Sequence, residues 1–197
     1  MSGIVIGIFL ILSLNSSPGG RAQSIVDLPC LGLKSHTILI SGYLVFDLIN
    51  SVVALIVSRV YLGLDPLVFD WATAVAVLFY VTFAAISLYK AFMGAPVKPH
   101  FGVSHGFPCI ITRSLKNYGL WFDALFPLPL LISFFEKSGS QPWMVFAGMM
   151  LGYVGWYLFL VGAVSTEATS HNLMWFAATC IMVLIDCVLI SMMLCCY

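Results

Sequence analysis

Residues 143–164 form an uninterrupted stretch of 22 residues without one charged side chain. As an α-helix, a stretch of this length rises about 33 Å, because each residue adds about 1.5 Å. The hydrocarbon core of a bilayer is about 30 Å thick, so this segment predicts a helix that crosses a membrane. A helix is required because the bilayer interior has no water to satisfy the polar groups of the backbone.

Other parts of the chain share this apolar character. Of the 197 residues, 61% are hydrophobic and only 8% are charged. An average soluble domain carries about 25% charged residues. The apolar runs do not alternate with polar residues, which excludes a membrane β-barrel. We therefore expect an all-α, polytopic transmembrane helical bundle of about five spans, at residues 37–57, 69–89, 118–135, 143–164 and 172–194.

A short apolar stretch and a polar linker precede the predicted bundle. Residues 3–14 would rise only about 18 Å as a helix, which is too little to cross the hydrocarbon core. This stretch lacks the basic flank of a signal peptide, so we expect a retained, membrane-associated segment. Cleavage, an interfacial position and packing into a partner stay open. The chain is thus divided into residues 1–36, the apolar segment with its linker, and residues 37–197, the transmembrane domain.

Basic residues are distributed unequally between the two ends of the predicted bundle. If five spans alternate, one side carries only Arg59 and Lys137. Basic loops stay preferentially in the cytoplasm or, in an organelle, in the matrix. The opposite side is therefore predicted to be cytoplasmic or matrix-facing, because it carries Arg21, Lys34, Lys90, Lys98, Arg113 and Lys116.

Glycines recur on one face of the span at residues 143–164. Gly148 and Gly152 form a small-x3-small motif, and Gly155 and Gly162 continue the series at seven-residue spacing from Gly148. Such a flat stripe lets another helix approach closely in a membrane. We predict a helix-packing face here, for a helix of this chain or of another protein.

Acidic residues lie within three of the predicted spans. Asp47 is near the middle of the first span, with Asn50 and Ser51 on the same helix face, and Asp123 and Asp186 lie in the third and fifth spans. A carboxyl group at this depth is costly and often marks a proton or ion path. The alternatives are hydrogen bonds between helices and contacts with a partner protein.

One loop holds the densest group of metal-ligand types. His100, His105 and Cys109 fall between the second and third predicted spans. Imidazole and thiolate suit zinc or iron, so these residues are a candidate metal site. The alternative is that they are interfacial loop residues bonded to backbone or water. A net charge of zero argues against nucleic-acid binding, which needs basic patches.

Two motifs that would identify a reaction, a phosphate-binding loop and H-E-x-x-H, do not occur in the sequence. Our first hypothesis is a non-catalytic membrane subunit of a larger complex, such as an energy-transducing complex of the mitochondrial inner membrane. The alternatives are a small transporter or channel that uses the intramembrane acids, and a membrane-embedded lipid-modifying enzyme. We expect other membrane subunits and bound lipids as partners, and no cofactor.

Overall fold

The computed structural model describes residues 2–15, 33–93, 112, 114–116, 118–164 and 168–195. Every regular element in these residues is a helix. Four of the helices are long and apolar enough to cross a membrane, at Thr37–Leu62, Pro66–Tyr89, Pro142–Gly162 and Phe176–Met193. The predicted all-α membrane bundle is therefore confirmed.

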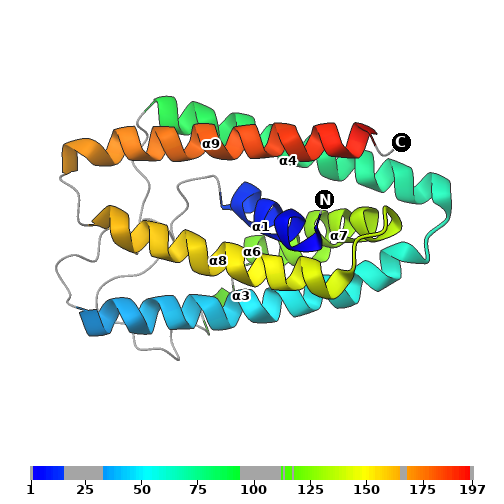
Figure 1. Ribbon diagram of the computed structural model, residues 1–197, viewed down its shortest axis with the longest axis horizontal. Helices are drawn as coiled ribbons and strands as arrows, with labels where there is room; N and C mark the ends of the chain where they lie inside the picture. Colours follow the sequence, from blue (N-terminus) through cyan, green and yellow to red (C-terminus); the bar gives the residue numbers. More distant parts are fainter. Residues whose placement is uncertain are drawn as a thin grey trace.

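The four long helices run along the longest axis of the molecule (Figure 1). They are α3 (Leu33–Leu62), α4 (Pro66–Phe92), α8 (Pro142–Val164) and α9 (Ala168–Cys195). Helices α3 and α9 begin at the end of the bundle where α4 and α8 finish (Figure 1). The short apolar helix α1 (Gly3–Leu14) lies among them and packs against α8 and α9.

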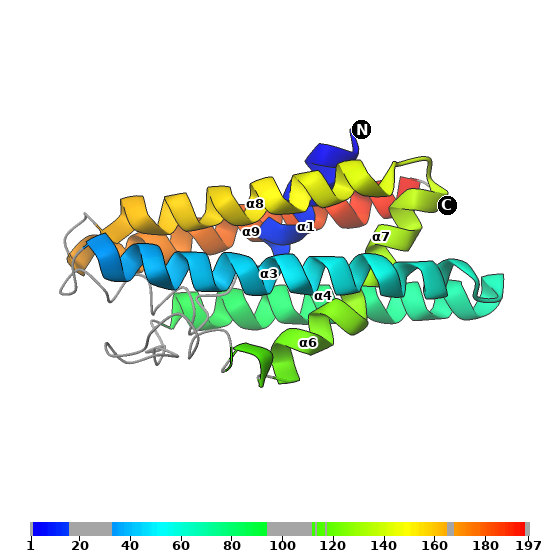
Figure 2. The same cartoon turned by 90° about the horizontal axis from the view of Figure 1, so that it is seen from below.

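The third predicted span, residues 118–135, is not one continuous helix. It is divided into α6 (Tyr118–Leu125) and α7 (Pro127–Lys137), which run obliquely to the long helices (Figure 2). The physical reason is the pair Pro127 and Pro129, because proline has no backbone N–H and its ring collides with the preceding helical turn. The prediction of about five spans thus becomes four long helices and one broken, oblique element.

Local sequence signals explain two of the helix boundaries. Helix α4 begins with Pro66, and the Asp65 carboxylate accepts a hydrogen bond from the Leu67 amide at 3.0 Å. This is N-terminal capping with proline at the first helical position. Helix α7 ends at Lys137, and Gly139 follows two residues later with a φ of +92°, which suits glycine. The Ser140 and Gly139 amides donate to the Phe135 and Glu136 carbonyls, each at 2.9 Å, which closes a Schellman motif.

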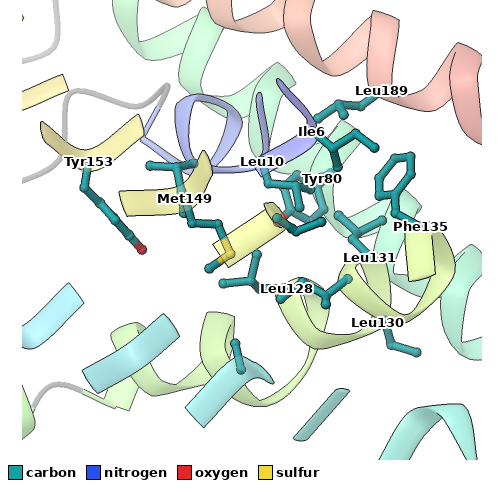
Figure 3. Close-up of a cluster of buried hydrophobic side chains, with 14 of the residues drawn as sticks. Ile6, Leu10, Tyr80, Leu128, Leu130, Leu131, Phe135, Met149, Tyr153 and Leu189 are labelled. Carbon is teal, nitrogen blue, oxygen red and sulfur yellow. The ribbon is translucent and has the colours of Figure 1, made fainter. Parts of the chain in front are cut away.

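The core of the bundle surrounds α1 and α7. Figure 3 shows Ile6 and Leu10 of α1 beside Tyr80 of α4 and Leu131 of α7. The outward faces of the long helices carry large apolar side chains that are well exposed, such as Ile56, Leu78 and Leu184. In water these side chains would be unfavourable, whereas lipid covers them without cost. The chain is thus a membrane-embedded protein.

Candidate functional site

Helices α1 and α8 cross in backbone contact. A methyl group added at Gly7 would collide with the backbone of Val145 and Gly148, and one added at Gly148 would collide with the Ile4 carbonyl. Glycine at both positions removes the side-chain bulk and lets dispersion contacts form between the two backbones. We call this contact the α1–α8 crossing.

The α1–α8 crossing extends by about one turn on each side. A Cβ at Gly3 would lie 2.9 Å from the Met144 Cβ, and one at Gly152 would lie 3.0 Å from the Ile11 Cβ. Gly148 and Gly152 of the predicted stripe therefore face a helix of the same chain. The facing motif, Gly3-x3-Gly7, was overlooked in the sequence, although it has the same spacing and could have been found.

Gly155 and Gly162, the other two residues of the stripe, lie outside this crossing. Both are exposed, and a Cβ at either would have no neighbouring atom within 4 Å. Leu151 and Leu158 stand four residues before and three residues after Gly155, so they flank it on the same helix face. Leu158 is 67% exposed. We call Leu151, Gly155 and Leu158 the open α8 face.

Asp47 of α3 lies inside the bundle and has a partner on another helix. It is 1% exposed, and its carboxylate accepts a hydrogen bond from the Tyr157 hydroxyl of α8. The Tyr157 ring stacks on Tyr43, with 6.2 Å between the ring centroids. Asn50 and Ser51, which were predicted to share the face of Asp47, are also buried. The arrangement joins α3 to α8 inside the bundle.

Asp186 of α9 is held by the N-terminal helix. It is 4% exposed and accepts a hydrogen bond from the Ser13 hydroxyl, which is fully buried near the end of α1. Both deep acids therefore find hydroxyl partners inside the chain. The sequence could not identify these partners, because 110 and 173 positions separate the bonded residues.

A third polar group lies close to Asp186. Tyr80 of α4 is buried, and its hydroxyl has no hydrogen-bond partner in the described part of the chain. This hydroxyl interacts electrostatically with Asp186, with Asp123 of α6 and with Tyr153 of α8. Figure 3 shows Tyr80 and Tyr153 projecting into the buried cluster from two different helices. Asp123, which was predicted from the sequence, is thus near this group and is half-buried.

One end of the bundle carries an ion pair and a cation–π contact. Arg59 forms an ion pair with Glu136, and Lys137 Nζ lies 3.4 Å from the centroid of the Phe69 ring. The Tyr61 hydroxyl donates to the Leu125 carbonyl at 2.8 Å. These contacts fasten the α3–α4 turn to α6 and α7, and they leave Arg59 engaged away from the deep acids.

The predicted metal-site residues His100, His105 and Cys109 lie outside the described residues. Within the residues that are described, no group of three or more His, Cys, Asp or Glu side chains could hold a metal ion. The metal-site hypothesis for the loop therefore stays a prediction.

The chain was compared with known proteins at the level of sequence and of structure. No protein-family model, no curated protein and no solved structure matches the chain.

Proposed function

We propose that the protein is a non-catalytic integral membrane subunit that packs within a larger membrane assembly. The observation that carries this proposal is the open α8 face. Gly155 continues the stripe by which Gly148 and Gly152 hold α1, yet it lies exposed beside Leu151 and Leu158. A small residue flanked by large apolar ones offers a partner helix a close approach in a membrane.

The internal packing is consistent with a structural role. Helix α1 is fixed by the α1–α8 crossing and by the bond from Ser13 to Asp186, and α3 is fixed to α8 through Asp47 and Tyr157. The acids are thus engaged inside the chain, and the proposal does not need a partner to satisfy them. An energy-transducing complex of an organelle, such as the mitochondrial inner membrane, is the kind of assembly we propose, because such complexes hold many apolar subunits within the bilayer.

The test is extraction in mild detergent, followed by native electrophoresis and mass spectrometry. The wild-type chain is expected to migrate in a complex much larger than itself, at a fixed ratio to the other subunits. Gly155→Leu fills the open α8 face and is expected to release the chain from that complex. Val75→Leu is the matched control, because Val75 is exposed on α4 and lies outside the open α8 face, and it is expected to leave the complex intact.

Two results would contradict the proposal. One is wild-type protein that migrates alone or as a small homo-oligomer under conditions that preserve other membrane complexes. The other is a complex that loses the chain equally in the Gly155→Leu and Val75→Leu variants, since the open α8 face would then have no special role.

A further inference from the structure

Asp186 lies at the middle depth of the membrane. It is the eleventh of the 18 residues in the span Phe176–Met193. With about 1.5 Å per residue, it lies roughly 15 Å along this span, about half of a 30 Å hydrocarbon core. A carboxyl group at this depth is a candidate functional group, and its role depends on the groups that bond to it.

The groups that face Asp186 come from the two helices packed against α9, namely α1 and α4. Helix α1 contributes the Ser13 hydroxyl and α4 contributes Tyr80. Tyr80 in turn interacts electrostatically with Asp123 of α6 and Tyr153 of α8. These groups are neutral or acidic, and no Lys, Arg or His side chain in the described residues is bonded to Asp186. An ionised Asp186 would therefore have no counter-charge there.

The end of α1 adds to the negative potential at this point. Ser13 is the penultimate residue of α1, which ends at Leu14. The last carbonyl groups of a helix carry partial negative charge, which disfavours an anion and favours a cation. In membrane transporters, the carbonyl ends of interrupted helices near the midplane bind sodium ions or protons. The chemistry around Asp186 thus selects a positively charged ligand.

The space around Asp186 limits the size of that ligand. A cavity of about 10 Å³ adjoins it, lined by Val77, Tyr80, Leu131, Asp186, Leu189, Ile190 and Met193. This volume is about that of one water molecule, and the surface of the cavity is apolar, so it offers a metal ion no ligands. Ser13 already bonds directly to the carboxylate, so no metal ion with its hydration shell fits between them. A proton is the positive ligand that the site can hold.

We propose that Asp186 is a proton-binding site in the middle of the membrane, with Ser13 as its hydrogen-bond donor and Tyr80 beside the same cavity. In the loaded state the carboxyl group carries the proton. On release, the O–H bond of Asp186 breaks, and the proton passes to a water molecule that reaches the carboxyl group. The carboxylate that remains keeps the hydrogen bond donated by Ser13. Such a site provides the proton-handling group that a transport role requires, and it does not depend on a partner protein.

The experiment is infrared difference spectroscopy of the full-length chain in liposomes, with the pH stepped in sodium-free buffer. A protonated carboxyl group in an apolar site has a carbonyl stretch that is separate from the amide bands. We expect one such band to be lost in Asp186→Asn and retained in Asp47→Asn. Ser13→Ala and Tyr80→Phe should each shift the band, because each removes a hydroxyl group next to the carboxyl group.

The outcomes decide the proposal in either direction. Circular dichroism identifies the variants that fold, and Ser13→Ala and Tyr80→Phe keep the test decisive where Asp186→Asn does not fold. A carboxyl band that none of the folded Asp186, Ser13 and Tyr80 variants alters would overturn the assignment. Loss of the wild-type band on adding sodium chloride at constant pH would also overturn it, since the site would then bind a metal cation instead of a proton.

Discussion

Two alanine substitutions in α8 separate helix packing from helix propensity. Gly148→Ala places a methyl group against the Ile4 carbonyl, whereas Gly155→Ala places one where no atom lies within 4 Å. Both changes replace glycine with alanine inside a helix, which by itself favours the helix by about 1 kcal/mol. This contribution cancels when the two variants are compared. The difference between them therefore reports on the α1–α8 crossing.

The expected difference follows from the contact that the methyl group meets. At Gly148 the obstacle is backbone, which cannot rotate away as a side chain can. Overpacking of this kind costs typically about 1–3 kcal/mol. We expect Gly148→Ala to be less stable than Gly155→Ala by that amount, and Gly155→Ala to be at least as stable as the wild-type chain. The assay is unfolding of the purified chain by sodium dodecyl sulfate in mixed micelles, followed by tryptophan fluorescence. Equal stability of the two variants would refute the close approach of α1 and α8.

Three further substitutions test other parts of the structure in the same unfolding assay. Tyr157→Phe leaves Asp47 buried without the phenol that donates to it, which is expected to lower the free energy of unfolding by about 1–3 kcal/mol. The control Tyr89→Phe, at an exposed position, should leave the stability unchanged. Equal stability of these two variants would argue against the hydrogen bond. Gly139→Ala forces alanine to a φ of +92° where no atom lies within 4 Å of the new methyl group. We expect a loss of about 1–2 kcal/mol from backbone strain alone, and an unchanged stability would show that the turn is different. Arg59→Ala removes an ion pair whose arginine side chain is 59% exposed, so a loss of no more than about 1 kcal/mol is expected, and a larger loss would mean that the pair is shielded from solvent.

The long helices could be predicted from the sequence because their signal is local. A run of apolar residues fixes the length of a spanning helix without reference to the rest of the chain. The cause of the break at Pro127 is local too, since the missing amide is a property of that residue. What composition did not reveal is that the break removes the third span as one continuous helix. Whether two half-helices together cross a bilayer depends on their tilt, which is set by contacts with neighbouring helices.

The acidic residues of the candidate site could be predicted from the sequence, but their hydrogen-bond partners could not. Asp47 and Asp186 could be identified because a charged residue within an apolar run is conspicuous. Ser13 and Tyr157 could not be assigned to them, because serine and tyrosine are common in membrane segments and nothing local marks the bonded one. The position of α1 depends on the same kind of long-range contact. The only sequence signal for this position is that Gly3 and Gly7 have the same four-residue spacing as Gly148 and Gly152.

The central claim is that the open α8 face binds a helix of another protein. The most direct measurement places a photoreactive amino acid at Leu158 in the native membrane, with Leu184 of α9, which is about equally exposed, as the control position. Irradiation is predicted to give one protein adduct of defined mass from position 158, none from position 184, and none from position 158 when Gly155→Leu is also present. Adducts with lipid alone at position 158, or the same adducts from both positions, would contradict the claim.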